Sequence, residues 1–342
     1  MEKLVPRLSI CIATFNRAKF ISHTLDSILV QMPLDVELII VDGASPDETQ
    51  EVMGRYLLRY PQIRYYRELV NSGVDCDYDK AVGYARGDYC WLMTDDDLLK
   101  PNAISCVLDY IDSSPNLIIV NSEVKNADFS KRLESCFLKF NGDREYSILD
   151  SERFFSEVAS YLSFIGCVVI KRTLWMGRDR RSYYGTLFVH VGVIFQHPPI
   201  TSVKVIADPL IIIRYGNAMW TARGFEIWML KWPQLIWSFT DFSDESKSTI
   251  SSREPWRAIK KLVLYRAIGG YSITEYRQFI ETKIKGAPHI LFILVALFPP
   301  RILNIIACLY CVLINRSARS GLYDLSRSRH ATWVSRLLGG FL

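Results

Sequence analysis

Three consecutive aspartates, Asp95, Asp96 and Asp97, follow directly after the apolar run 89–93. Carboxylates packed this closely repel each other, so their pKa values rise unless a cation or hydrogen-bond donors compensate. Mg²⁺ and Mn²⁺ prefer oxygen ligands, and a cation held there would in turn hold phosphate oxygens. The alternative is a solvated turn whose last aspartate caps the helix expected from Pro101. The cluster alone leaves both interpretations open.

The elements around this cluster alternate between strands and helices. Predicted strands cover 8–13, 36–41, 63–66, 89–93 and 117–120, with a further one at 163–170, and predicted helices cover 21–32, 48–60, 77–86 and 101–111. Such alternation predicts an α/β fold with a mainly parallel sheet flanked by helices. Ligands of open sheets of this type collect beyond the carboxyl ends of the strands. We therefore expect the loops TFNR, DGASPD and TDDD to converge at that edge.

The order and spacing of three segments resemble the family 2 glycosyltransferases. The segments are SICIATFNR at 9–17, ELIIVDGASPDET at 37–49 and NSGVDCDYDKAVGYARGDYCWLMTDDD at 71–97, followed by Pro101. Each is weak alone, but together they are fairly specific over roughly residues 7–125. The resemblance implies a GT-A-type fold, a single α/β domain that binds a nucleotide sugar.

The resemblance also implies residues that bind the donor. Thr14 and Phe15 would line the nucleobase pocket, and Asp42 at a strand end would hydrogen-bond the base or ribose. Phe15 as plain core and Asp42 as a turn former are the alternatives. Arg17 and Lys80 are candidate phosphate or substrate contacts, unless they are solvated surface cations. The full expected donor-binding set is Thr14, Phe15, Asn16, Arg17, Asp42, Asp75, Lys80 and Asp95.

For the metal, the resemblance implies Mg²⁺ or Mn²⁺ at a DxD-type motif. The usual first aspartate of that motif is Thr94 here, which leaves Asp95 and Asp96 as the working pair. Asp95 would contact the ribose or the metal region. Asp96 would be the metal ligand and, through the metal, a catalytic residue. Asp97 is either a second ligand or a residue that caps or orients the other two.

A catalytic base is harder to place. In the family, the neighbourhood of 183–192 holds an acidic residue that deprotonates the acceptor, but this chain has no Glu-Asp pair there. The nearest suitable side chain is His190, which as a neutral imidazole could act as general base. The alternative is a structural histidine that only makes a hydrogen bond, and Asp179 is then the remaining candidate. Whether the reaction inverts or retains the anomeric centre stays open.

The segments YLSFIGCVVIKRTLW at 161–175 and YYGTLFVHVGVIF at 183–195 resemble the bacterial abequosyltransferase-like branch of O-antigen (lipopolysaccharide) biosynthesis. That branch implies a CDP-activated 3,6-dideoxyhexose such as abequose as donor, and a lipid-linked oligosaccharide as acceptor. Two alternatives remain: an enzyme that transfers sugar to a polyprenyl phosphate, and a non-catalytic scaffold that binds a nucleotide sugar.

Composition narrows the class of partner. The 342 residues carry a net charge of +5, too mild for a nucleic-acid-binding chain. Eight scattered cysteines favour reduced thiols over a disulfide framework. The N-terminus lacks the pattern of a cleavable signal, so the catalytic face is expected in the cytoplasm. The oligomeric state cannot be inferred.

The C-terminal part differs in character. We expect a glycosyltransferase domain over 1–242 and a helical module over 243–342, joined by a polar linker at 243–253. Residues 287–314 are strongly apolar, but Pro299-Pro300 divides them into pieces too short to cross a bilayer. Arginines follow this stretch. The pattern favours a peripheral or monotopic element on the cytoplasmic face of the inner membrane, over a true span or a buried helix pair.

Overall fold

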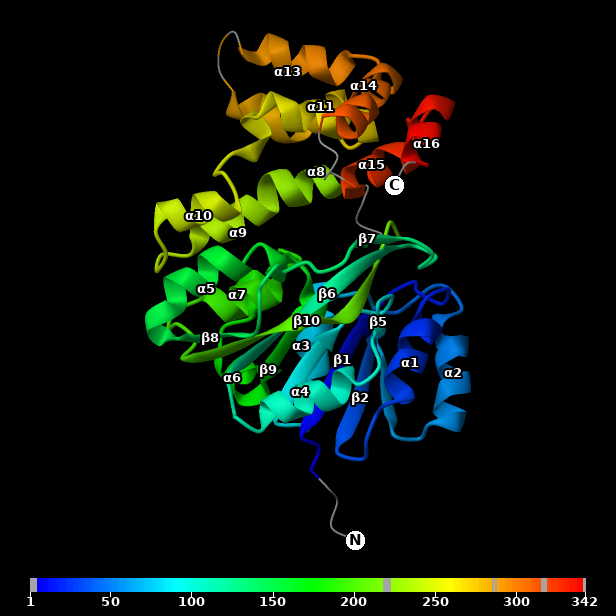
Figure 1. The fold of residues 1–342 in the computed structure, drawn as a ribbon, viewed down its shortest axis with the longest axis vertical. Coiled ribbons are helices and arrows are strands. Elements are labelled where there is room, and N and C mark those ends of the chain that lie inside the picture. Colours follow the sequence, from blue (N-terminus) through cyan, green and yellow to red (C-terminus); the bar gives the residue numbers. More distant parts are fainter. Residues whose placement is uncertain (1–4, 218–222, 285, 287, 315–318, 341–342) are drawn as a thin grey trace. The chain divides into compact units, whose positions relative to one another are not determined.

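The structure is a computed structural model that describes residues 5–217, 223–284, 286, 288–314 and 319–340 (Figure 1). The chain divides into two compact units. The first unit holds Met1–Tyr215 and Phe239–Ser246, and the second holds Gly216–Ser238 and Lys247–Leu342. This division differs from the boundary expected after residue 242, because the apolar side chains of Phe225 and Met229 pack in the core of the second unit.

The first unit is built on a ten-stranded sheet in the order β3-β2-β1-β4-β9-β6-β10-β5, with β7 beside β6 and β8 beside β10. The strands are β1 (Leu8–Thr14), β2 (Val36–Asp42), β3 (Ile63–Arg67), β4 (Tyr89–Met93), β5 (Leu98–Leu99), β6 (Leu117–Asn126), β7 (Arg132–Glu134), β8 (Arg144–Ser147), β9 (Val168–Lys171) and β10 (Ser202–Tyr215). Neighbours among β3, β2, β1 and β4 are parallel, as are β6 and β10. β9 is antiparallel to both β4 and β6, so the sheet is mixed.

Helices cover the sheet because its strands are apolar on both faces. β1 and β2 are buried along their whole length. The core cluster that contains alternate β1 residues also contains side chains of α1 (Ile21–Leu29), α2 (Thr49–Arg59) and α4 (Ala103–Ile111). α3 (Val74–Tyr84) contacts β1 and β2 outside that cluster. The expected α/β class is confirmed.

One expected strand is shorter than its sequence suggests. The segment 163–170 was expected to be a strand throughout, but residues Ile165–Cys167 form a 3-10 turn and only Val168–Lys171 is extended. The Trp91 indole donates to the Gly166 carbonyl oxygen at 2.8 Å, and a Cβ on Gly166 would lie 2.3 Å from the Phe164 ring. The close packing of a buried tryptophan against this turn therefore replaces strand pairing. The first unit continues with α5 (Ser151–Val158), α6 (Arg172–Gly177) and α7 (Val189–Phe195).

The described part of the second unit is helical. Its main helices are α8 (Gly224–Glu226), α9 (Trp232–Ser238), α11 (Ile259–Ile268), α12 (Ile273–Glu275), α13 (Pro288–Leu297), α14 (Pro300–Leu313), α15 (Arg319–Arg327) and α16 (Trp333–Gly339). Two apolar clusters hold it together, one around Tyr271 and Tyr276 and one around Cys308 and Leu325. All eight cysteines of the chain are free thiols, as expected.

The polar stretch expected to be a linker contains a helix, α10 (Asp244–Ile250). Ser243 precedes it, and its hydroxyl accepts from the Ser246 amide at 3.1 Å, the arrangement of an N-cap. Asp244 and Glu245 in the first turn favour the positive end of the helix dipole.

No single helix among the described residues is long and apolar enough to cross a membrane. Only the pair His289–Leu297 and Pro300–Leu313, bent by 93°, meets that test when taken together.

Candidate active site

The parallel strands bring the predicted polar loops to one edge of the sheet. Thr14 and Asp42 are the last residues of neighbouring strands and lie directly opposite each other in the register. The aspartate loop follows β4, which pairs with β1 on its other side. The Gly43 amide donates to the Thr14 carbonyl oxygen at 2.9 Å and joins the first two loops. The convergence expected from the strand order is therefore present.

The Asp42 carboxylate is fully buried and organises the loop after β2. It accepts from the Ser45 amide at 2.8 Å and from the Tyr65 hydroxyl at 2.5 Å, and the Arg67 Nε lies 3.6 Å away. Burial, and then the hydrogen bond to Asp42, raise the pKa of the Tyr65 phenol. This carboxylate thus holds the loop in place while lying at the edge where a base or ribose would bind.

The loop after β1 is tied to the loop after β2 through its backbone. The Asn16 amide donates to the Ser45 hydroxyl at 2.9 Å, and the Arg17 amide donates to the Thr49 hydroxyl at 3.1 Å. Asn16 has a left-handed backbone, with φ of 58°. Phe15 is half-buried and Asn16 is exposed, so both remain reachable by a ligand at this edge.

Asp95, Asp96 and Asp97 are at most 9% exposed. The Arg17 guanidinium lies against the first two: Nε is 3.4 Å from Asp95 Oδ1, and an Nη is 3.2 Å from Asp96 Oδ2. Burial, and then the neighbouring Asp96 charge, raise the pKa of Asp95 to about 7, although Arg17 and the Thr14 hydroxyl oppose the shift. Burial and Asp96 also raise the pKa of Asp97 well above its ordinary value. The loop thus gathers three buried carboxyl groups, two of which contact Arg17.

Asp97 holds this loop to the rest of the unit. Its Oδ1 accepts from the Arg214 amide at 2.7 Å, its Oδ2 accepts from the Thr94 hydroxyl, and its carbonyl oxygen accepts from the Thr24 hydroxyl at 2.8 Å. Asp97 was expected as a metal ligand, with an orienting role as the alternative. Since both carboxylate oxygens already accept hydrogen bonds from the protein, the geometry favours the orienting role.

Arg214, near the end of β10, was missed by the sequence reasoning. Its Nε donates to the Asp96 carbonyl oxygen at 2.9 Å, and an Nη donates to the Ala127 carbonyl oxygen at 2.7 Å. The guanidinium carbon lies 4.0 Å from the centre of the Phe129 ring and 5.2 Å from that of Phe20. Burial lowers the pKa of this arginine. The sequence could have indicated it, because Arg214 is a basic residue near the end of an apolar strand, at the edge of the sheet where a ligand is expected.

Two expected donor-binding residues have other partners in the structure. The Lys80 ammonium lies 2.7 Å from Glu68 Oε2 and 3.7 Å from Asp77 Oδ1. The Asp75 carboxylate, 4% exposed, accepts from the backbone amides of Gly185, Leu187 and Val189 at 2.8, 2.9 and 3.0 Å. These contacts favour roles in fixing the loops that surround the site.

His190 lies inside the apolar helix α7 and is 1% exposed. Its Nε2 is 2.6 Å from the Leu162 carbonyl oxygen, and burial lowers its pKa to about 4. These features favour the structural histidine that was the alternative to a general base. Asp179 is exposed, and hydrogen bonds from Ser182 lower its pKa. No described contact joins either side chain to the aspartate loop.

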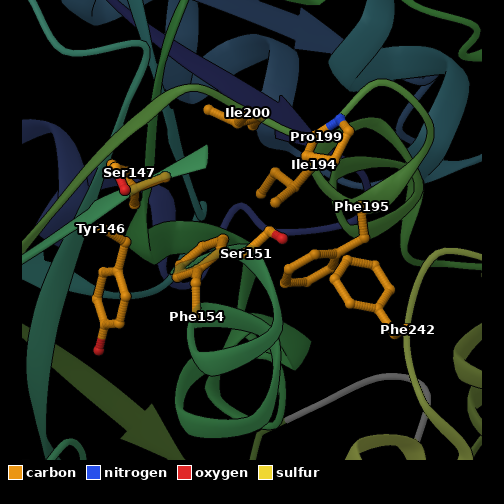
Figure 2. A pocket seen from close by; sticks show the side chains of 10 residues that line it. Tyr146, Ser147, Ser151, Phe154, Ile194, Phe195, Pro199, Ile200 and Phe242 are labelled. Carbon is orange, nitrogen blue, oxygen red and sulfur yellow. The ribbon is translucent and has the colours of Figure 1, made fainter. Parts of the chain in front are cut away.

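The described part of the first unit also contains a small apolar cavity away from these loops (Figure 2). Tyr146, Phe154, Phe195 and Phe242 are among the side chains around it. Its volume of about 10 Å³ suffices for about one water molecule. None of the predicted site residues lines it, so it is a packing defect of the aromatic core rather than a donor pocket.

The aspartate loop offers the donor chemistry that a hard divalent cation requires. Among the described residues, no three His, Cys, Asp or Glu side chains are grouped as a complete metal site. Mg²⁺ sites on phosphate substrates, however, use one or two carboxylates and complete the shell with phosphate oxygens and water. Asp95 and Asp96 supply two carboxylates on adjacent residues, beside the Arg17 guanidinium. The residues present fit such a cation.

Comparison with known proteins agrees with this geometry. Residues 9–158 match the family described as glycosyl transferase family 2. The abequosyltransferase RfbV of Salmonella typhimurium is 28% identical over 235 residues, which cover 64% of this chain and 69% of that protein. The chondroitin synthase of Escherichia coli is 31% identical over 126 residues, 37% of this chain and 18% of that protein.

Among solved structures, residues 1–349 of TarS from S. aureus superpose with a TM-score of 0.56 at 15% identity. The superposition covers 93% of this chain and 89% of that one. At this level of identity the likeness concerns the fold, and it supports the arrangement of sheet and helices described above.

Proposed function

We propose that the chain transfers a sugar from a nucleotide-sugar donor onto a lipid-linked oligosaccharide. The match of residues 9–158 to glycosyl transferase family 2 supports this proposal. The donor we propose is a CDP-activated 3,6-dideoxyhexose such as abequose, and the process is O-antigen synthesis at the cytoplasmic face of the inner membrane. The similarity to an abequosyltransferase over 64% of the chain supports this choice of sugar. The fold of TarS, which has been solved with UDP-GlcNAc, supports a nucleotide-sugar donor in general.

The observation that carries the proposal is the Asp95-Asp96 pair beside Arg17, at the same sheet edge as Asp42. In this proposal Asp42 orders the loop beside the base or ribose of the donor, through its hydrogen bonds with Ser45 and Tyr65. Arg17, which pairs with Asp95 and Asp96, would bind the donor diphosphate. Asp97 and Arg214 keep the loop in its conformation.

Asp96, with Asp95, would hold Mg²⁺ or Mn²⁺, which when bound supplies positive charge that stabilises the diphosphate leaving group. The acceptor hydroxyl must lose a proton during transfer. His190 is poorly suited to accept that proton, because its ring is buried and already donates to the Leu162 carbonyl oxygen.

The test is a panel of CDP-, UDP- and GDP-sugars, scored by release of the nucleoside diphosphate with Mn²⁺ and a lipid-linked acceptor. In Asp96→Asn we expect metal-dependent nucleotide binding to weaken about tenfold or more, and release of the nucleoside diphosphate to fall with it. The reason is that a hydrogen bond or ligand interaction of a charged group is worth about 1.5–3 kcal/mol. The matched control is Asp109→Asn, which changes an exposed aspartate on α4 and should behave as the parent.

Three results would contradict the proposal. Nucleotide binding by Asp96→Asn that equals the parent in the presence of Mn²⁺ would remove the carboxylate pair from the donor site. A parent that binds nucleotide sugars but releases no diphosphate with any donor and acceptor would indicate the scaffold alternative instead. Transfer to polyprenyl phosphate without an oligosaccharide would indicate the other enzymatic alternative.

A further inference from the structure

Helices α13 and α14 each bury one face in the second unit and expose an apolar face on the other side. In α14, Asn304 and Cys308 are fully buried, whereas Ile306 is 54% and Leu313 is 66% exposed. Four exposed aliphatic side chains of α14 recur at spacings of four, three and four residues, which is one face of a helix. They are Ile302, Ile306, Leu309 and Leu313.

The same division is found in α13. Phe292 and Ala296 pack in the core of the unit, and the exposed residues are Ile290, Leu291, Leu294, Leu297 and, just beyond the helix, Phe298. Both helices contact α11 within the second unit. The exposed faces of α13 and α14 therefore point away from α11. We call these two exposed faces together the apolar surface, and exposed apolar faces of this kind mark interaction sites.

Three arginines gather at the break between the two helices. The Arg266 Nε donates to the Phe298 carbonyl oxygen at 2.9 Å, and Arg301 lies in the first turn of α14. The pKa of His330 is lowered by burial and then by the positive charges of Arg329, Arg266 and Arg301, so all three cations lie near that imidazole. None of the three makes an ion pair with a carboxylate in the described part of the chain. We call this group the arginine cluster.

The charge of the two units points to the chemistry of the partner. The second unit contains 17 Lys and Arg against 5 Asp and Glu, a formal charge of +12, whereas the first contains 24 against 31, a charge of −7. A second copy that docked symmetrically through the same apolar surface would bring one arginine cluster close to another, which like charges disfavour. An anionic bilayer offers hydrocarbon to the apolar surface and phosphate groups to the arginines.

We propose that the apolar surface of α13 and α14 lies in one leaflet of an anionic bilayer, with Arg266, Arg301 and Arg329 at the level of the lipid phosphates. The 93° bend at Pro299-Pro300 lets two short helices lie in the interface where neither could span it. The surface binds lipid whether or not the first unit transfers a sugar, so this inference does not depend on the proposed donor.

The test is co-sedimentation of the purified full chain with vesicles. We expect binding to vesicles of phosphatidylcholine that contain about 30% of the anionic lipid phosphatidylglycerol. Binding to vesicles of pure phosphatidylcholine should be much weaker. Ile306→Glu should lower partitioning about tenfold or more, since it places a charge in the apolar surface. Arg301→Gln should lower it about fivefold on anionic vesicles only.

Leu58→Glu is the matched control, because Leu58 is 90% exposed on α2 of the first unit and should not affect partitioning. Nucleotide binding by every variant should equal that of the parent, which separates failure of this inference from failure of the proposed function. A parent that stays in the supernatant with anionic vesicles would overturn the proposal, as would unchanged partitioning of Ile306→Glu. Self-association of the parent that Ile306→Glu abolishes, without vesicle binding, would assign the surface to a second copy and also overturn it.

Discussion

His190 should make the stability of the folded protein depend on pH. The side chain is 1% exposed, and its Nε2 lies 2.6 Å from the Leu162 carbonyl oxygen. A carbonyl oxygen only accepts, so Nε2 carries the proton and the ring is neutral. Burial lowers the pKa from an ordinary 6.5 to about 4, because a charged imidazolium would lose its hydration there.

The sign and size of the effect follow from that pKa. Below pH 6.5 the unfolded chain binds a proton at His190 that the folded protein does not take up until about pH 4. The free energy of unfolding therefore falls as the pH falls through this window, and the contribution is fully present above it. A displacement of about 2.5 pH units corresponds to roughly 3 kcal/mol.

The measurement is urea unfolding of the parent and of His190→Gln at pH 7 and pH 4.5. The glutamine amide can still donate to the Leu162 carbonyl oxygen, but it does not titrate. Because carboxylates also titrate in this range, the quantity of interest is the difference in pH dependence between the two proteins, expected at about 2–3 kcal/mol. His197→Gln is the control, since His197 is 75% exposed and its replacement should leave most of the pH dependence in place.

Equal pH dependence in the parent and His190→Gln would refute the assignment of a buried neutral imidazole. The same variant tests the catalytic interpretation. We expect sugar transfer at pH 7 to stay within a few-fold of the parent, with unchanged donor affinity. A loss of transfer by several orders of magnitude in a folded variant would restore His190 as general base.

Three further predictions concern the loops around the site. Asp75→Ala should lower the free energy of unfolding by about 3 kcal/mol, because three backbone amides lose a charged acceptor, and nucleotide titration of the folded variant should show parent-like affinity. Gly43→Ala should lower the thermal midpoint, because a Cβ would lie 2.6 Å from Asp77 Oδ2, whereas Gly54→Ala has open space around it on α2 and should not. Arg214→Lys keeps the charge but not the fork that donates to the Asp96 and Ala127 carbonyl oxygens, so nucleotide affinity measured by calorimetry should fall by about tenfold. Parent-like stability of Asp75→Ala, an unchanged midpoint for Gly43→Ala or full affinity of Arg214→Lys would each contradict the corresponding role.

Much of the first unit could be predicted because its strands are short apolar runs that each end in a polar loop. Strand order then brings Thr14, Asp42 and the aspartates together without any knowledge of side chains. The partners of those side chains could not be predicted, because they come from distant segments. Asp97 is held by Arg214, 117 residues further along, and Asp75 by amides 110 to 114 residues away.

The 3-10 turn at Ile165–Cys167 was missed for a related reason. Its sequence favours a strand, but the Trp91 indole requires an acceptor, and the Gly166 carbonyl supplies it. Similarly, the polar composition of 243–253 suggested a linker, although a serine followed by two acidic residues is a helix start. In both segments, local hydrogen bonds determine the secondary structure more than the average polarity of the residues does.

The net charge of +5 is the sum of a negatively charged first unit and a positively charged second unit. A carboxylate-rich first unit suits a site that holds cations and binds an anionic donor through them, since those charges would otherwise repel a diphosphate. A second unit at +12 is attracted to the same anionic lipid surface that repels the first. An anionic bilayer would thus orient the molecule before any apolar side chain inserts. Raising the salt concentration should accordingly weaken vesicle binding more for the parent than for Arg301→Gln.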